Sequence, residues 1–486
     1  MISPSLDSFK KKIKNGNLIP IYKNIDINFD NPFKILKKLP KEKNIYLLES
    51  YEGPLKWSRY SFMGFDPKLV ISSYKEKIKI QKQKKTKIIN GDPFDEIKKI
   101  MSKYKPVKTK GLPRFFGGLV GFFSYDIVSK IEKIKRAKKD DVKFPDCLLM
   151  LSDSLIIFDN VKKIAKIVVN VETKKNSNIE ILYKKAIKKI SEIELKLIKN
   201  NIEKSKHIKS KNNIKSNHKP SQFMNSVKKI KEYVKSGDII QAVISQRWKT
   251  KFYNNPIDLY STLRELNPSP YMFYIKNNSK YIIGASPEVL VRLENNIVES
   301  RPIAGTRPRG KDNKSDIKFE KELLNDPKEK AEHIMLVDLA RNDISRVCQY
   351  GSVEVQNMMS VERYSHVMHI VSNVKGKLNK KYDAVDVFKS CFPAGTLSGA
   401  PKIRAMQIIS ELEPNVRGPY GGSVGYIGFS GNMDMSITIR SFYINGNDLY
   451  FQAGAGIVAD SKPNMELKET INKSGAMLKA IQKTNE

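Results

Sequence analysis

The chain lacks the features of a secreted or membrane-spanning protein. No stretch approaches the roughly 18 unbroken apolar residues that a membrane span requires. Residues 1–10 contain neither an apolar core region nor a small-residue cleavage site, which argues against secretion. The three cysteines, Cys147, Cys348 and Cys391, show neither metal-ligand nor redox spacing. We therefore expect a cytoplasmic protein with no membrane partner.

Acidic residues are scarce relative to basic ones. The chain has 51 Asp and Glu residues against 88 Lys and Arg residues, and its formal net charge is +37. Such a balance is typical of nucleic-acid-binding proteins, because basic patches attract phosphate backbones. Here, however, the lysines are spread over nearly every segment together with abundant Ile and Asn, and no localised basic and aromatic platform stands out. We attribute the bias to A+T-rich coding and expect no nucleic-acid partner; a basic nucleic-acid-binding protein is the remote alternative.

The chain length of 486 residues and the 40% hydrophobic content allow two or three domains with a large core. Helical periodicity over residues 181–197 leads into residues 200–220, which are too polar to bury and predict a solvated linker. We place a boundary there, between an N-terminal region of residues 1–199 and a C-terminal region of residues 221–486. No internal repeat is visible.

Short strand patterns fill the N-terminal region. Residues 45–50 are an apolar strand candidate that leads into a turn signal at residues 51–54. Residues 115–125 predict a buried strand whose glycines permit close backbone packing. Alternating lysines at residues 77–84 predict an edge strand with one face in water.

Polar blocks punctuated by glycine and proline crowd the C-terminal region. They cover residues 301–310, 392–402, 418–422 and 452–456. An ordinary core does not need so many small residues beside Arg, Tyr and Glu. A pocket for an anion does, because backbone N–H groups approach an anion closely only where side chains are absent.

Two pairs of glutamates stand at helical spacing between these blocks. Glu329 and Glu332 share one helix face, as do Glu466 and Glu469. Each pair alone is most simply a surface partner of nearby lysines. Two pairs close to glycine-rich blocks instead favour two acidic faces opposed across a cleft, which would hold Mg²⁺ through carboxylate oxygens.

Two nucleotide-binding patterns fail on inspection. Residues 305–311 nearly match a phosphate loop, but Asp312 replaces the required Ser or Thr and Pro308 removes a backbone N–H group. Residues 454–459 echo a dinucleotide-binding fingerprint, but a Pro-containing turn follows where its helix should continue. Both fit better as small-residue walls of a carboxylate pocket, with Arg440 available for a bidentate contact.

Three further residues are candidates for proton transfer or metal binding. His366 and His369 are three residues apart but have no third metal ligand nearby, so His366 is best interpreted as a structural histidine. Glu288 follows a Pro-bounded turn and is either exposed to water or presented to a cleft.

Taken together, these blocks closely resemble the chorismate-utilising enzymes, and most specifically the large subunit (component I) of anthranilate synthase. The resemblance runs from about residue 19 to residue 479 and is strongest from Ser221 onward. It implies an α+β fold of two large packed β-sheets flanked by helices, with both sequence halves forming one compact body.

The resemblance also implies residue roles. Glu332 and Glu469 correspond to direct Mg²⁺ ligands, with Glu329 and Glu466 close by. Glu288 and His369 match positions of proton transfer around the C4 hydroxyl. The substrate-pocket positions are Gly305, Thr306, Tyr420, Arg440, Gly454, Ala455 and Gly456, and Lys473 is an additional candidate. One departure is Gly475, which weakens its helix by roughly 1 kcal/mol relative to Ala.

Two positions separate subtypes of this family. Aminodeoxychorismate synthase relatives typically carry a lysine nucleophile where this chain has Ala304. Isochorismate-forming relatives use a lysine base where this chain has Gln241. The absence of both lysines points to ammonia as the attacking species; another chorismate-utilising enzyme is the nearest alternative.

The implied reaction converts chorismate and ammonia to anthranilate and pyruvate, the first step of tryptophan biosynthesis, with Mg²⁺ as cofactor. None of the three cysteines lies in the Gly-x-Cys-x-Gly elbow of a class I amidotransferase. We therefore expect a separate glutamine amidotransferase subunit (component II), commonly in a heterotetramer of two large and two small subunits.

The N-terminal region matches a regulatory role in the same family. Ser50 and the segment with Pro270, Tyr271 and Met272 resemble the two pieces that build a feedback site for L-tryptophan. Without the family, strand and turn packing would explain both pieces. With it, feedback inhibition by L-tryptophan is expected.

Overall fold

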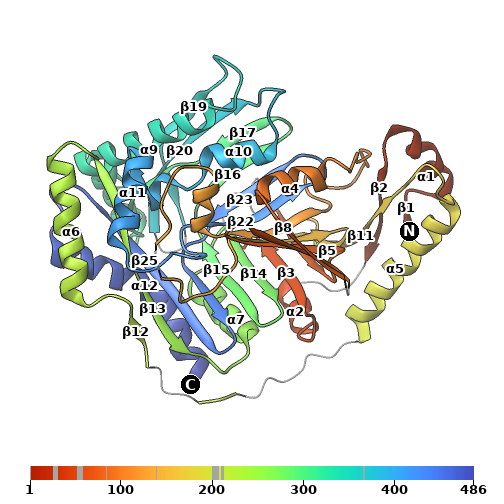
Figure 1. Cartoon of the computed structure of the whole chain (residues 1–486), viewed down its shortest axis with the longest axis horizontal. Helices are drawn as coiled ribbons and strands as arrows, with labels where there is room; N and C mark the ends of the chain where they lie inside the picture. Colours follow the sequence, from red (N-terminus) through yellow and green to blue (C-terminus); the bar gives the residue numbers. More distant parts are fainter. Residues whose placement is uncertain are drawn as a thin grey trace.

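The computed structural model describes residues 2–25, 31–51, 59–83, 85–137, 139–199, 207–209, 213–364 and 367–486. Two large antiparallel β-sheets pack face to face, and helices surround them (Figure 1). Within the described residues, no helix is both long and apolar enough to cross a bilayer.

The first sheet contains thirteen strands of the described part of the chain. Their order across the sheet is β1 (Ile2–Ser3), β2 (Leu18–Ile25), β11 (Ile164–Glu172), β10 (Ser154–Asp159), β4 (Tyr60–Phe65), β3 (Asn44–Glu49), β14 (Tyr271–Asn277), β15 (Lys280–Ser286), β24 (Ser441–Asn445), β25 (Asp448–Ile457), β13 (Gln241–Lys251) and β12 (Lys215–Ser216), and β21 (Gly399–Ala400) also pairs with β13.

The second sheet contains twelve strands of the same described residues. Their order is β18 (Ile303–Pro308), β20 (Val367–Lys377), β17 (Ile297–Ser300), β16 (Val289–Glu294), β23 (Met433–Ile437), β22 (Ser423–Gly428), β8 (Gly118–Phe123), β9 (Cys147–Ser152), β5 (Leu69–Tyr74), β6 (Lys77–Lys82) and β7 (Lys85–Asn90), and β19 (Glu354–Arg363) also pairs with β20.

Each sheet combines strands from both sequence halves. In the first sheet β3 pairs with β14, with Leu47 opposite Tyr274. In the second, β8 pairs with β22, with Gly121 opposite Gly425. Neither sheet is therefore complete without the other half of the chain. The predicted α+β fold, with both halves in one compact body, is confirmed.

A hydrophobic core joins the two sheets. Phe62 of β4 packs edge-on against Tyr426 of β22, with ring centroids 5.8 Å apart, and against Phe115 at 5.1 Å. Buried aromatic side chains contribute large apolar areas, so such contacts hold the sheets together.

Helices cover the outer faces and one end of the assembly. They are α1 (Leu6–Lys12), α2 (Pro32–Lys37), α4 (Pro93–Met101), α5 (Ile179–Lys199), α6 (Pro220–Lys235), α7 (Pro256–Leu266), α8 (Asn313–Asn325), α9 (Pro327–Ser345), α10 (Ala384–Cys391), α11 (Lys402–Leu412) and α12 (Pro463–Asn485), with 3₁₀ turns η1 (Ile13–Asn15), η2 (Tyr125–Lys130) and η3 (Gly395–Leu397). In Figure 1, α6, α11 and α12 lie at one end of the molecule and α5 at the other.

Most local predictions agree with these elements. Residues 45–50 correspond to β3, and residues 115–125 contain β8, where a Cβ on Gly121 would overlap the Leu148 carbonyl of β9. The strand predicted at residues 77–84 is β6, but it is not the edge: β7 pairs with it and forms the edge of the sheet.

Two predictions fall partly outside the described residues. Of the turn predicted at residues 51–54, only residue 51 is described. His366 lies outside the described residues. Of the segment 200–220, the described part includes β12, which pairs with β13, and the first residue of α6. The regulatory and catalytic roles assigned to residues 1–199 and 221–486 stay predictions.

Candidate active site

The first glutamate pair lies near the start of α9. Asp326 caps this helix, and its carboxylate accepts hydrogen bonds from two backbone N–H groups of the first turn. Glu329 forms an ion pair with Arg307 of β18, with 3.1 Å between Oε1 and Nη1. Gly305, also on β18, has a φ of 63°, and a Cβ there would lie 3.2 Å from Glu329 Oε2. Glycine at this position therefore allows β18 and the acidic face around Glu332 to come close together.

The second pair lies near the start of α12. Glu466 is buried, with 8% of its surface exposed, whereas Glu469 is exposed. Lys473 Nζ lies 2.7 Å from Glu469 Oε1 and donates a hydrogen bond to the Gly454 carbonyl at 3.2 Å. Lys473 thus links the acidic face of α12 to the small-residue block on β25.

The acidic faces of α9 and α12 share one electrostatic environment. Burial raises the pKa of Glu332, and the charges of Glu329 and Glu469 raise it further. Burial also raises the pKa of Glu466, and Glu469 again adds to the shift. Glu332 lies on α9 and Glu469 lies on α12. The two glutamate pairs are therefore far apart in sequence, yet their negative charges repel one another in space. A cation between them would relieve this repulsion.

A complete metal site is not preformed by protein side chains alone. In the described part of the chain, no group of three or more His, Cys, Asp or Glu side chains is placed to hold a metal ion. Mg²⁺, however, usually takes one or two protein carboxylates and completes its shell with water and substrate oxygens. The assignment of Glu332 and Glu469 as ligands therefore stays a prediction, and the chemistry of these groups fits it.

Glu288 provides a carboxyl group whose pKa is raised above its ordinary value. It lies in the short turn between β15 and β16 and is partly buried. Loss of hydration raises the pKa of Glu288 to about 7, although the cations of Arg440 and Lys473 oppose the shift. Thr396 Oγ1 donates a hydrogen bond to Glu288 Oε1 at 3.0 Å. A carboxyl group with this pKa exchanges a proton near neutral pH, which suits acid–base catalysis.

Arg440 lies between β23 and β24 with a φ of 50°, unusual for a residue other than glycine. Burial lowers the pKa of its guanidinium, and the Glu288 carboxylate opposes that effect. Among the described residues, we find no hydrogen-bond acceptor for this guanidinium. A partly buried guanidinium with unused donors is suited to bind a carboxylate ligand.

His369, Gly305 and Thr306 form a second polar group across β20 and β18. His369 Nδ1 lies 2.9 Å from the Gly305 carbonyl oxygen and 3.1 Å from Thr306 Oγ1. Burial lowers the pKa of His369, which favours the neutral ring. Because a carbonyl oxygen can only accept, we assign the ring proton to Nδ1, which leaves Nε2 as an acceptor.

Tyr420 meets the small-residue block on β25. A Cβ on Gly454 would lie 2.8 Å from the Tyr420 hydroxyl, and a Cβ on Gly456 would lie 2.6 Å from Gln241 Nε2. These two glycines therefore leave room for side chains from neighbouring elements. Ala455 points the other way, into the apolar cluster beneath α6 and α11, so it can meet a ligand only through its backbone.

The residues predicted to bind L-tryptophan lie together at the interface of the two sheets. Ser50, Tyr271 and Met272 line one cavity of about 400 Å³, and Pro270 is buried beside it. The Tyr271 hydroxyl donates a hydrogen bond to Asp434 Oδ1 at 3.0 Å. A ligand role for these residues stays a prediction.

Sequence analysis did not single out the charged residues of this cavity. Arg114 Nη2 lies 3.1 Å from Asp434 Oδ2, and Arg114 Nε donates to the Tyr426 hydroxyl at 3.0 Å. These residues come from separate strands and a loop, so nothing in their sequence spacing connects them.

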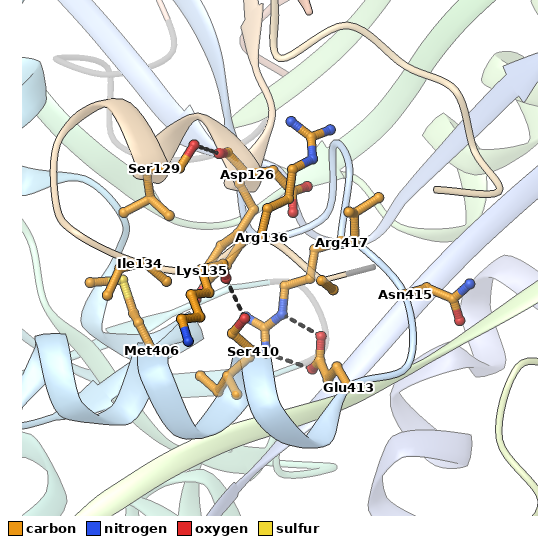
Figure 2. A pocket seen from close by; sticks show the side chains of 15 residues that line it. Asp126, Ser129, Ile134, Lys135, Arg136, Met406, Ser410, Glu413, Asn415 and Arg417 are labelled. Atoms are coloured by element: carbon orange, nitrogen blue, oxygen red, sulfur yellow. Dashed lines mark hydrogen bonds and ion pairs between the residues drawn. The ribbon is translucent and has the colours of Figure 1, made fainter. Parts of the chain in front are cut away.

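Another cavity, of about 360 Å³, lies between the segment around Asp126 and the end of α11 (Figure 2). A buried ion pair closes one side: Arg417 Nη2 lies 2.7 Å from Glu413 Oε1. The Arg417 guanidinium also packs against the Tyr420 ring, 5.7 Å from its centroid. Sequence analysis missed this support of Tyr420, although Arg417 directly precedes the 418–422 block.

Comparisons with known proteins decide the family. The family model described as chorismate binding enzyme matches residues 44–479. The chain belongs to this family. The resemblance inferred from the sequence motifs is confirmed.

Within the family, the chain is similar to anthranilate synthase component 1 along its whole length. It is 47% identical to the protein of that name from Aquifex aeolicus (strain VF5), covering 98% of this chain and 97% of the relative. It is 44% identical to that from Acetivibrio thermocellus, covering 100% of both chains. These relatives place the chain with the anthranilate synthase component 1 members of the family.

Solved structures agree with the observed architecture. The crystal structure of anthranilate synthase component I from Streptococcus pneumoniae TIGR4 has a TM-score of 0.76 at 36% identity, covering 86% of this chain and 92% of that one. MenF, the menaquinone-specific isochorismate synthase from Escherichia coli, has a TM-score of 0.71 at 19% identity, covering 98% of both chains. The second likeness shows the shared fold alone.

Proposed function

We propose that this chain binds chorismate and uses ammonia to convert it to anthranilate and pyruvate, the entry step of tryptophan biosynthesis. One observation carries the proposal: a chain similar throughout to anthranilate synthase component 1 has Gln241 and Ala304 at the two places where a lysine would signal another reaction. Gln241 faces Gly456, and Ala304 is buried. Neither side chain is an amine, so the nitrogen has to come from outside the chain.

Substrate binding follows from the charges of the site. Chorismate carries two carboxylates, and the Arg440 guanidinium offers paired donors to one of them. Because Gly454 and Gly456 have no side chains, the Tyr420 hydroxyl and the Gln241 amide approach β25 closely, and these polar groups would border the bound substrate. Lys473 already contacts this strand and supplies a second cation.

Proton transfer follows from Glu288 and His369. Near neutral pH, Glu288 is partly protonated and donates its proton as the C4 hydroxyl leaves as water. Ammonia adds at C2 and the resulting ammonium group loses one proton, which restores the proton that Glu288 gave up. Removal of the C2 proton and its delivery to the methylene carbon of the enolpyruvyl group then release pyruvate and restore the aromatic ring. His369, neutral with Nδ1 bonded to Gly305, offers Nε2 as a proton acceptor. Chorismate and ammonia thereby give anthranilate, pyruvate and water.

Mg²⁺ is proposed to bind between the acidic faces of α9 and α12. Glu332 and Glu469 would hold the ion, with Glu329 and Glu466 close by. Burial and the negative charges of neighbouring glutamates raise the pKa values of Glu332 and Glu466, and a bound cation would offset that repulsion. When bound, the ion would supply positive charge for the ring carboxylate of the substrate.

Ammonia is proposed to come from a separate glutamine amidotransferase subunit, in a complex of two large and two small subunits located in the cytoplasm. Cys147, Cys348 and Cys391 are all buried, and burial raises their thiol pKa values to about 11 or 12. Such thiols are poor nucleophiles, so they do not supply a glutaminase site.

Feedback inhibition by L-tryptophan is proposed for the cavity lined by Ser50, Tyr271 and Met272. Aromatic side chains and a few polar groups line this cavity, a combination typical of small-ligand sites. Arg114 and Asp434 on its wall carry opposite charges, which suits the zwitterionic backbone of an amino acid.

An anthranilate fluorescence assay with chorismate, Mg²⁺ and an ammonium salt tests the function. The isolated chain should form anthranilate, and Glu332→Gln should abolish it, whereas Asp338→Asn on the exposed side of α9 should not. Mg²⁺ should raise the thermal midpoint of the wild type but not that of Glu332→Gln. Formation of isochorismate or aminodeoxychorismate would assign the chain to another chorismate reaction. No turnover together with salt-sensitive DNA binding would favour the nucleic-acid alternative.

A further inference from the structure

The block of residues 392–402 contributes Thr396, which donates a hydrogen bond to Glu288, but no function has yet been assigned to this contact. It connects α10 to α11 through the 3₁₀ turn η3 and the short strand β21. Thr396 lies in η3, and its hydroxyl reaches Glu288, whose turn lies 108 positions earlier in the chain. Both residues line a cavity of about 400 Å³ between α9 and the edge of β16.

Backbone and side-chain contacts hold this turn in place. Ser398 Oγ donates to the Ala394 carbonyl at 2.8 Å, which closes the turn on itself. Arg417 Nη1 donates to the Leu397 carbonyl at 2.6 Å, and the Val243 N–H donates to the Ser398 carbonyl at 2.9 Å. The hydroxyl of Thr396 is thus presented from a fixed backbone.

The opposite side of the turn packs against α9. A Cβ on Gly395 would overlap the Leu339 side chain, so the backbone at this residue rests directly on the helix. Glycine at 395 therefore serves close packing, and Thr396 is the polar side chain of the turn that faces the site.

Glu288 is held at its backbone as well. The Ile437 N–H donates to the Glu288 carbonyl at 3.0 Å, and Ser286 Oγ donates to the same carbonyl at 3.3 Å. Within the described part of the chain, the Glu288 carboxyl group accepts a side-chain hydrogen bond from Thr396 and from no other residue. It engages Oε1 and leaves Oε2 for another partner.

We propose that Thr396 is a positioning residue that fixes which oxygen of Glu288 carries the transferred proton. With Oε1 accepting from Thr396, a protonated Glu288 carries its proton on Oε2. The fixed turn then directs that proton toward the C4 hydroxyl of the substrate. This inference rests on the proposed role of Glu288 as general acid.

A neutral donor is chemically suited to this task. Arg440 and Lys473 already lower the proton affinity of Glu288, while burial raises it. Two more charged groups line the same cavity, but both are paired: Arg301 with Glu362, and Asp343 with Lys402. A third cation bonded to Glu288 would keep its carboxyl group ionised, whereas a hydroxyl orients it and leaves it able to carry a proton.

Steady-state kinetics of Thr396→Val and Thr396→Ser, with ammonium as nitrogen source, test the proposal. Valine keeps the shape but removes the donor, so kcat should fall about tenfold while the KM for chorismate stays within about twofold. Serine should restore kcat to within about threefold of the wild type. If valine leaves kcat unchanged, or serine fails to restore it, the proposal is wrong. Thr396→Ala serves as the second donor-free variant if valine prevents folding.

The pH profile supplies a readout that a purely structural role would not move. Thr396 stabilises the ionised form of Glu288, so its loss raises the pKa of that acid. The fall of kcat at high pH should therefore move to higher pH in Thr396→Val and stay in place in the control Thr109→Val, which changes a remote loop.

A double-mutant cycle separates this inference from the proposed function. In a Glu288→Gln background, Thr396→Val should cause little further loss of kcat, because the group it positions can no longer donate a proton. An equal loss in both backgrounds would overturn the inference. Absence of anthranilate from the wild type itself would overturn the proposed function instead.

Discussion

Glu288 shows how one side chain acquires acid–base chemistry from its surroundings. Removal from water raises its pKa, two cations and a hydroxyl group lower it again, and the balance lies at about 7. A carboxyl group in water would be almost fully ionised at that pH. Its position in a partly buried turn therefore makes it able to protonate a leaving hydroxyl group under neutral conditions.

The first prediction concerns this acid. The proposed role of Glu288 as general acid makes its protonated form the active one, so kcat should fall as the pH rises above about 7. Glu288→Gln should lower kcat by roughly two orders of magnitude or more and remove this dependence. Rates of anthranilate formation between pH 6 and 9 check both outcomes. Retention of the same high-pH fall in Glu288→Gln would show that another group is responsible.

At the scale of elements, α9 and α12 each carry one glutamate pair. The positions of the two helices determine whether both pairs can bind the same metal ion. The ion pair of Glu329 with Arg307 attaches α9 to β18, and Lys473 attaches α12 to β25. Both strands carry small residues at these contacts. The glycines at these contacts therefore serve to bring helices and strands close together.

The second prediction concerns Gly475, which lies within α12. A Cβ at this position would meet no atom within 4 Å. Gly475→Ala should therefore increase the free energy of unfolding by about 0.5–1 kcal/mol, because alanine loses less backbone entropy in a helix. Urea unfolding measures the change. Gly305→Ala is the matched contrast and should be destabilising, since its φ is 63° and a Cβ would lie 2.8 Å from Leu323.

At the scale of the whole molecule, the pairing of the two sequence halves builds the cavity proposed for regulation and connects it to the region of the proposed active site. The cavity assigned to L-tryptophan uses β3 from the first half and β14 from the second. Tyr271 of that cavity pairs with Ser286, two residues before Glu288. The two sites therefore share the hairpin of β14 and β15.

The third prediction follows from this shared architecture. Ser50→Phe places a large side chain in the cavity and should abolish inhibition by L-tryptophan. The kcat without tryptophan should change less than about twofold, because Ser50 does not contact the residues assigned to catalysis. Inhibition curves of a tryptophan-sensitive wild type, of Ser50→Phe and of the exposed control Ser102→Phe provide the measurement. An unchanged response in Ser50→Phe would refute the assignment.

The sequence alone was sufficient for the fold class and the family, whereas the roles of the candidate site residues stay predictions. Helical spacing predicted that Glu329 and Glu332 share a face, and both lie on α9. The missing lysines at Gln241 and Ala304 indicated the reaction type. The prediction for the glutamates succeeds because spacing along a helix determines which side chains share a face, whatever the element later packs against. The reaction type followed instead from the resemblance to the family.

The tertiary structure alone decided which of these groups meet. It placed Thr396 beside Glu288, Arg417 beneath Tyr420 and Arg114 beside Asp434, and it turned Ala455 away from the site. Thr396 and Glu288 are 108 positions apart, and Arg114 and Asp434 are 320 positions apart, so no helix or strand spacing connects them. Arg417 and Tyr420 are only three residues apart, but they lie outside any helix, so helical periodicity does not predict their contact. Hydrogen bonding, hydration and charge act through space, so partners brought together by sheet pairing leave no signature in a single sequence.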